Sequence, residues 1–165
     1  SLLRERGAGQ DGMRITAELA RFITGPVLMT IATRDAANRP LIARGSGGHV
    51  SPDLARVDVA VSARLWPETI AHVRENGMFT VTFVQPADYR AFQVKGRAEV
   101  RPATPEDEAR AEAYVAGTEA LLTGLGVPLD LIRHWLTARE IAIVALTVDR
   151  VFEQTPGPRA GAVVG

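Results

Sequence analysis

Short β-branched segments separated by turn residues constrain the fold of this chain more than any other feature. Val57, Val59 and Val61 alternate with smaller or polar residues, which is the period-two pattern of a half-buried strand. Further strand-like runs occupy residues 27–33, 41–44, 78–84, 89–101 and 141–152. Because short turns join most of these runs, we expect neighbouring strands to pair antiparallel. The sequence therefore predicts a mainly β (α+β) fold, an antiparallel barrel of about six strands with flanking helices, which leaves few exposed edges.

Helix signals lie between and after the strands. They predict helices over residues 14–23, 67–75, 104–122 and 129–138. At the start of the longest one, Thr104 can cap the helix, Pro105 suits its first position and Asp107 completes a capping box. Gly96 inside a strand predicts a β-bulge. The glycine-rich stretch 45–48 is either a tight bend or a phosphate-binding loop, and the bend is favoured because no helix follows it.

Composition limits the class of protein. The 165 residues suit one domain, 1–165, with loose tails expected at 1–12 and 154–165. Basic and acidic residues both number 19, so no chain-wide basic surface is expected for nucleic acid or an anionic membrane. The lack of cysteine excludes disulfides and thiolate chemistry. No apolar run approaches the ~20 residues that span a bilayer, and the polar N-terminal stretch lacks a signal-peptide core, so we expect a cytoplasmic protein.

Familiar catalytic motifs are absent from the sequence. His49, His72 and His134 lie in different predicted elements without metal-ligand spacing, so no metal site is predicted, and His72 and His134 are expected on helix surfaces. No nucleophile elbow, Walker loop or Rossmann fingerprint occurs. One strand stands out, because period-two geometry puts Gln93 and Lys95 side by side on the face opposite Phe92 and Val94. That polar face is either a solvated surface or part of a ligand site.

Several motifs together resemble the pyridoxamine 5'-phosphate oxidase-like, FMN-binding split-barrel family. The stretch from Gln93 to Glu99, followed by Thr104-Pro105-Glu106-Asp107, is similar to the oxidase pattern of a Gln-Val strand, a glycine and a Ser/Thr-Pro-Glu helix start. The run from Pro40 to Arg44 resembles the family's Pro-x-x-x-Arg strand. The order of elements agrees from about residue 22 to residue 152. This resemblance implies a six-stranded split β-barrel.

The resemblance also implies a homodimer with one FMN in each of two clefts between subunits. Residues that match the family's cofactor-binding positions are Arg44, Gly45, Ser46, His49, Ser62 and Gln93, and we place Lys95 in the same cleft. The family's phosphate-binding Ser-Arg-Lys cluster is replaced here by Pro67-Glu68-Thr69, so the phosphate would rely on Arg44, Arg64, Ser62 or Thr69. The oxidases' terminal Arg-Leu-x-Pro motif is missing, so turnover of pyridoxamine phosphate itself is not expected.

Three functions remain open at this point. The first is a flavin-dependent oxidoreductase of unknown small-molecule substrate, in which the cofactor does the redox chemistry and the catalytic residues are unknown. The second is a non-catalytic module that binds flavin or haem, with His49 as the axial ligand in the haem case. The third is a deazaflavin-dependent reductase. Fold alone does not choose among them.

Overall fold

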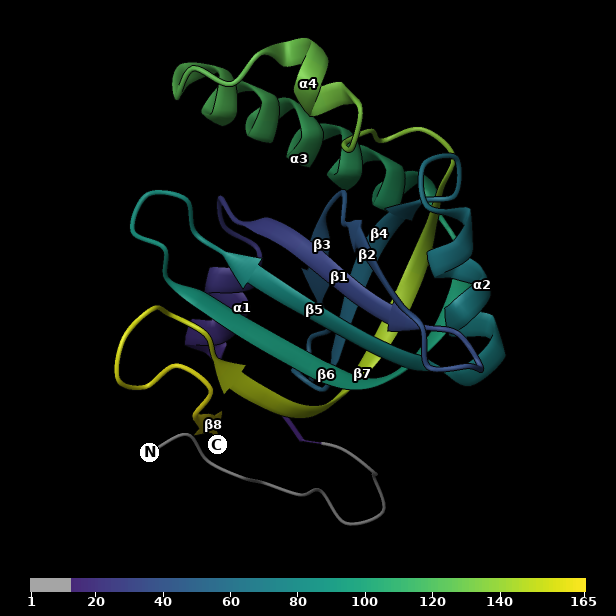
Figure 1. Ribbon diagram of the computed structural model, residues 1–165, viewed down its shortest axis with the longest axis vertical. Coiled ribbons are helices and arrows are strands. Elements are labelled where there is room, and N and C mark those ends of the chain that lie inside the picture. The colour runs from purple at the N-terminus through teal and green to yellow at the C-terminus, as the bar shows by residue number, and fades with distance from the viewer. Residues whose placement is uncertain (1–12) are drawn as a thin grey trace.

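The computed structural model describes residues 13–165, and Figure 1 shows a β-barrel with helices at its ends. The helices are α1 (Ala17–Ile23), α2 (Pro67–Asn76), α3 (Pro105–Gly124) and α4 (Leu129–Arg133). The strands are β1 (Leu28–Arg34), β2 (Pro40–Arg44), β3 (Gly48–Val50), β4 (Arg56–Ser62), β5 (Met78–Val84), β6 (Ala91–Pro102), β7 (Ile141–Glu153) and β8 (Val163–Val164). The predicted mainly β, α+β class is confirmed.

The strands pair antiparallel in the order β2-β1-β5-β6-β7-β4-β3, and a bend between β2 and β3 closes the ring. At the bend the Gly45 amide donates to the Met29 carbonyl (3.3 Å), whereas the Ser46 amide donates to the Ala60 carbonyl (2.7 Å). A Cβ on Gly45 would lie 3.0 Å from side-chain atoms of both Met29 and Val59, so a residue without a side chain fits best here. The glycine-rich stretch is thus a bend, and β2 with β3 forms one of six barrel strands.

Gly96 marks a bulge in β6, as its position in the strand predicts. The pairing of β6 with β7 shifts between Lys95 and Gly96, and a Cβ on Gly96 would collide with the Thr147 carbonyl oxygen. A bulge bends its strand and increases the local twist. This allows the N-terminal half of β6 to pair with β5 and its C-terminal half to continue along β7.

Helix α3 lies over one end of the barrel with α4 packed against it (Figure 1). The predicted capping box is present, because the Thr104 hydroxyl accepts from the Asp107 amide and the Asp107 carboxylate accepts from the Thr104 amide. Beyond the barrel, Leu122, Ile132 and Leu136 form a small apolar cluster of their own. The two helices therefore form a separately packed hairpin beside the main core.

Three details differ from the sequence-based expectations. Helix α4 ends at Arg133 rather than continuing to residue 138, and β8 pairs with β7, so the C-terminal tail is not loose throughout. His72 is half-buried, with its Nδ1 2.9 Å from the Thr33 hydroxyl, instead of lying free on the helix surface. The expectation for residues 1–12 falls outside the described residues.

Within 13–165, no helix has the length and apolarity needed to cross a membrane.

Candidate functional site

One row of side chains crosses the outer face of four neighbouring strands and the end of a fifth. We call it the outer row: Arg44 on β2, Thr30 on β1, Thr82 on β5, Gln93 on β6 and Phe152 on β7. Each residue is the direct pairing partner of the next, and directly paired residues project from the same face of an antiparallel sheet. All five are half-buried. The outer row thus brings together two residues, Arg44 and Gln93, that lie far apart in the sequence.

Short polar contacts hold Arg44 and Gln93 in the outer row. Nη1 of Arg44 donates to the Thr30 hydroxyl (2.8 Å), and the guanidinium carbon lies 5.4 Å from the centre of the Trp135 ring. Three strands away, Nε2 of Gln93 donates to the Thr82 hydroxyl (3.3 Å). Three strand spacings separate Arg44 from Gln93, or about 14 Å. A ligand touching both residues would have to be long and lie across the strands.

Lys95 joins this face one row further along β6. It pairs with Thr80, two residues from Thr82, so its side chain projects from the same face as Gln93. Its ammonium nitrogen lies 5.2 Å from the centre of the Phe152 ring, a cation–π distance. The structure therefore places Arg44, Gln93 and Lys95 on one face.

The other predicted contacts near the bend serve the fold. Gly45 is buried between the Met29 and Val59 side chains. Ser46 is 1% exposed, and its hydroxyl donates to the Thr137 carbonyl (2.6 Å). Ser62 is fully buried, and its hydroxyl donates to the Arg139 carbonyl (3.2 Å). These hydroxyls fix the loop that follows α4 to the barrel, so they do not line an open face.

The predicted phosphate residues on and before α2 are not gathered with the outer row. Arg64 is exposed in the turn after β4. Thr69 is fully buried, and its hydroxyl has no hydrogen-bond partner within residues 13–165. Glu68, in the first turn of α2, is exposed and favoured there by the helix dipole. Of the two arginines predicted for the phosphate, Arg44 is therefore the one that belongs to the outer row.

His49 lies on β3, away from the outer row, opposite Asp58 of β4. Its half-buried side chain lines a groove of about 470 Å³ beneath α3. Asp58 belongs to a set of charged groups that we call the ion cluster, which joins β4, β6 and α3. Its members are Arg56, Asp58, Arg101, Asp107 and Arg110.

The ion cluster is stabilised by close charge pairing. Arg101 holds both oxygens of Asp107 (2.6 and 3.2 Å) and one of Asp58 (3.1 Å). These hydrogen bonds, chiefly from Arg101, lower the pKa of Asp107 well below its usual range. Sequence reasoning assigned Asp107 only to the helix cap, because the sequence does not show that a strand arginine reaches it.

Two aromatic residues near Arg44 escaped the sequence analysis. Trp135 stacks on the Arg44 guanidinium, and Tyr114 of α3 donates its hydroxyl to the Val27 carbonyl (2.8 Å). Burial raises the pKa of Tyr114 to about 12, although a hydrogen bond with Thr118 and the charge of Arg44 act in the opposite direction. No local motif marks these residues, because the α3–α4 hairpin brings them to the barrel from a distant part of the sequence.

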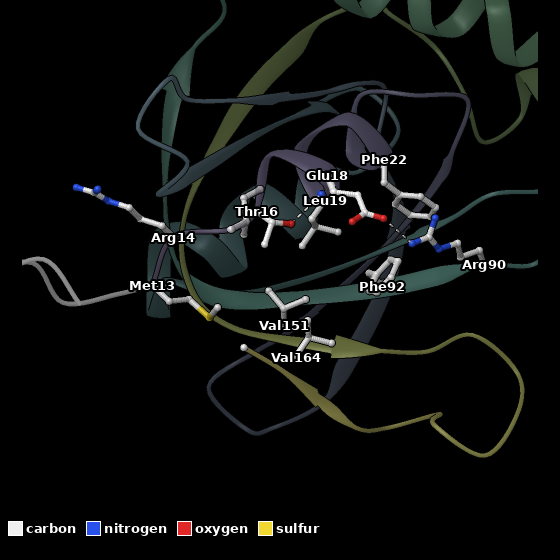
Figure 2. Close-up of a pocket in the computed structure, with 12 residues that line it drawn as sticks. Met13, Arg14, Thr16, Glu18, Leu19, Phe22, Arg90, Phe92, Val151 and Val164 are labelled. Atoms are coloured by element: carbon white, nitrogen blue, oxygen red, sulfur yellow. Dashed lines mark hydrogen bonds and ion pairs between the residues drawn. The ribbon is translucent and has the colours of Figure 1, made fainter. Parts of the chain in front are cut away.

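A separate small pocket lies at the other end of the barrel, beside α1 (Figure 2). Its volume is about 90 Å³, and its walls are mainly apolar. The Arg90 guanidinium lies 5.4 Å from the ring centres of both Phe22 and Phe92, and it pairs with Glu18 (3.4 Å). None of the predicted site residues lines this pocket. Within residues 13–165, no three His, Asp or Glu side chains are arranged to hold a metal ion.

Comparisons with known proteins agree on the fold. No protein-family model matches the sequence, and no curated protein is significantly similar to it. Among solved structures, HupZ of Group A Streptococcus superposes with a TM-score of 0.56 at 20% identity, covering 89% of this chain and 99% of that one. A candidate pyridoxamine 5'-phosphate oxidase from Lactobacillus delbrueckii gives 0.54 at 14% identity, covering 91% and 99%. The fold is that of the pyridoxamine 5'-phosphate oxidase-like split barrels.

A third split barrel of similar size supports the same conclusion. The conserved hypothetical protein Rv2991 from Mycobacterium tuberculosis gives a TM-score of 0.54 at 15% identity, covering 90% of this chain and 88% of that one. The family resemblance seen in the strand motifs is thus confirmed at the level of the fold. At these identities the likeness does not transfer a ligand or an activity to this protein.

Proposed function

We propose that this split barrel binds FMN along the outer row and acts, as a homodimer, as a flavin-dependent oxidoreductase on a small-molecule substrate. The observation that carries the proposal is the alignment of Arg44 and Gln93, three strand spacings apart, in one half-buried row. A long ligand with an anionic end and a flat polar end matches that arrangement. When bound, FMN would supply the redox chemistry.

The Gln93 end suits the flavin ring. A side-chain amide offers both N–H donors and a carbonyl acceptor, so it can pair with the mixed carbonyl and N–H edge of an isoalloxazine. Gln93 keeps capacity for this, since its side chain bonds only the Thr82 hydroxyl and the more distant Gln154 amide (3.5 Å) within residues 13–165. Lys95 adds a positive charge on the same face, which would stabilise negative charge on the reduced ring.

The Arg44 end suits the phosphate, with fewer contacts than the oxidases have. One N–H of Arg44 bonds Thr30, and its other guanidinium donors remain for a bidentate phosphate contact. The Ser46 and Ser62 hydroxyls bond main-chain carbonyls, and Glu68 is an acid at the start of α2. We therefore expect phosphate binding to depend strongly on Arg44.

The outer face also suits a second copy of the chain. Its floor consists of small, uncharged, half-buried residues, Thr30, Ala32, Thr80 and Thr82. Ile42 on the neighbouring strand pairs with Ala32, so it projects from the same face, and it is 55% exposed. A twofold partner that covers this face would bury these residues and close a cleft over the outer row. Sedimentation of the FMN-bound protein should give a dimer, and a flavin-bound monomer would contradict this part of the proposal.

FMN titration with fluorescence detection tests the cofactor assignment. Arg44→Ala and Lys95→Ala should each weaken FMN binding about tenfold or more, because each removes a charge-assisted contact. Arg21→Ala removes the same charge from the exposed surface of α1 and is the matched control. Thermal unfolding checks that each variant is folded. If both test variants bind FMN like the parent, the outer row is not the site.

The visible spectrum of the purified protein separates the alternatives. Flavin absorbance would support the proposal. A haem or deazaflavin spectrum would instead show that the protein binds that group in place of FMN. The segment that carries the substrate motif in the oxidases begins here at Gln154 and Thr155, which contact Gln93 and Ala91. Because the motif itself is missing, we expect no robust turnover of pyridoxamine phosphate, and mass analysis of released cofactor with substrate screening should identify the reaction.

A further inference from the structure

A groove of about 470 Å³ runs between α3 and the rim of the barrel, apart from the outer row. The barrel side consists of residues 23–29 and 47–49, and the helix side of the α3 face from Arg110 to Leu121. Its walls are mainly apolar, and they include the buried side chains of Val27 and Met29. From Arg110 to Leu121 the helix rises about 16 Å, so the groove is long and narrow.

Small residues on α3 keep the groove open. Ala113 and Gly117 face it, and a Cβ built on Gly117 meets no atom within 4 Å. Tyr114 fixes the helix to the barrel through its hydrogen bond to the Val27 carbonyl. Near this attachment Gly47 lies close to α3, with its Cβ position 3.5 Å from the Tyr114 Cβ. The helix is thus anchored at Tyr114, and the space beside Gly117 stays free.

The polar groups of the groove gather at the Arg110 end. Arg110 gives one N–H of its guanidinium to Asp107 (2.8 Å), which leaves other donors free. The ion cluster holds three arginines against two aspartates, so it carries one excess positive charge. His49 lies at the same end, and within residues 13–165 its side chain has no hydrogen bond or ion pair. Its ring can therefore donate an N–H to a ligand.

We propose that this groove binds an amphipathic carboxylate, a molecule with one negative charge and an unbranched apolar chain. The carboxylate would pair with Arg110 and His49, which matches the single excess charge of the ion cluster. The apolar chain would lie along Ala113, Gly117 and Leu121, where burial of its surface drives binding. This site does not depend on the flavin proposal, because Arg44, Gln93 and Lys95 do not line the groove.

The test uses decanoate as the probe, measured by titration calorimetry on the full chain. Decanoate should bind saturably, while decanol, which lacks the charge, and acetate, which lacks the chain, should bind at least tenfold more weakly. Arg110→Gln should reduce decanoate affinity about tenfold and leave decanol affinity unchanged, since it removes one charge-assisted contact.

Two glycine substitutions on α3 give a matched pair. Gly117→Leu places a side chain in the open space of the groove, and it should reduce decanoate affinity at least tenfold. Gly124→Leu also meets no atom within 4 Å but lies outside the groove, so it should bind decanoate like the parent. Both changes favour the helix, and thermal unfolding confirms that both variants fold.

Four results would overturn the proposal. Three of them are the lack of saturable decanoate binding, equal binding by the parent and Gly117→Leu, and equal binding of decanoate and decanol. Loss of decanoate binding in Arg44→Ala with unchanged binding in Arg110→Gln would also contradict it, because that pattern would place the carboxylate on the outer row.

Discussion

The outer row and the ion cluster both bring polar side chains together across strands, but they use their hydrogen-bonding groups differently. In the ion cluster, Asp58 and Asp107 are 6% and 4% exposed, and each carboxylate oxygen accepts from a guanidinium. In the outer row, Arg44 is half-buried and keeps donors beyond its bond to Thr30. Buried carboxylates whose oxygens are all paired stabilise the fold, whereas half-buried groups with spare hydrogen-bonding capacity are available to a ligand.

The largest loss in the free energy of unfolding should come from breaking the ion cluster. Arg101→Met leaves two buried carboxylates short of a partner, so the free energy of unfolding should fall by about 3–5 kcal/mol. Denaturant unfolding measures this loss. Arg133→Met is the control, because Arg133 pairs with Glu119 at the surface, where ion pairs contribute about 0–1 kcal/mol. Similar losses in both variants would show that the cluster is not a stabilising unit.

Acid should weaken the same cluster. The pKa of Asp107 is lowered in the folded protein, chiefly by Arg101, so the unfolded state binds its proton first as pH falls. The stabilisation from Asp107 is therefore complete at neutral pH and is lost below the unfolded pKa of about 3.9, toward the lower folded pKa. Asp107→Asn should flatten the pH dependence of unfolding in that range. A variant that keeps the parent's acid profile would contradict this assignment.

The fold could be predicted from the sequence because its signals are local. Alternation in residues 57–61, Gly96 within a strand, and the Thr104–Asp107 cap each act within a few residues, and the structure has a strand, a bulge and a cap at these positions. The strand β4 is, however, buried on both faces rather than half-buried, because Asp58 belongs to the ion cluster and Ala60 packs against Ala111 of α3. The expected end of the helix at residue 138 was wrong, because Leu136 packs into the hairpin cluster from an irregular segment after α4. Tertiary packing there overrides the apolar spacing that favoured a longer helix.

The candidate site could be predicted only in part. The family motifs and period-two geometry indicated Arg44, Gln93 and Lys95, which the structure places on one face. Ser46 and Ser62 have the right residue type for phosphate, yet their hydroxyls bond a loop more than 70 residues further along the chain. Such long-range contacts leave no pattern in a single sequence.

The free energy of unfolding should fall by a smaller amount when one hydroxyl between the two regions, that of Tyr114, is removed. Tyr114→Phe leaves the buried Val27 carbonyl without its partner and should cost about 1–2 kcal/mol. Because the folded pKa of Tyr114 is raised to about 12, its stabilisation is complete below an unfolded pKa of about 10 and is lost as pH rises toward 12. Unfolding measured from neutral to alkaline pH should show the gap between parent and variant closing. A gap that is constant with pH would mean that the Tyr114 proton does not contribute.

The smallest loss of stability is expected at Gln93. This substitution distinguishes the outer row from the ion cluster most clearly, because it should change FMN affinity more than stability. Gln93→Ala removes a half-buried amide with a long hydrogen bond to Thr82 (3.3 Å), so the free energy of unfolding should change by less than about 0.5 kcal/mol. FMN affinity should nevertheless fall severalfold, up to about tenfold, because a neutral hydrogen bond to the ring contributes about 0.5–1.5 kcal/mol. Gln154→Ala, which removes only the distant neighbour of Gln93, is the control and should change FMN affinity less. Arg101→Met should show the reverse pattern, with a large loss of stability and little change in FMN affinity while folded. If Gln93→Ala instead destabilises the fold and leaves FMN binding intact, the outer row is a structural network like the ion cluster and is not an FMN site.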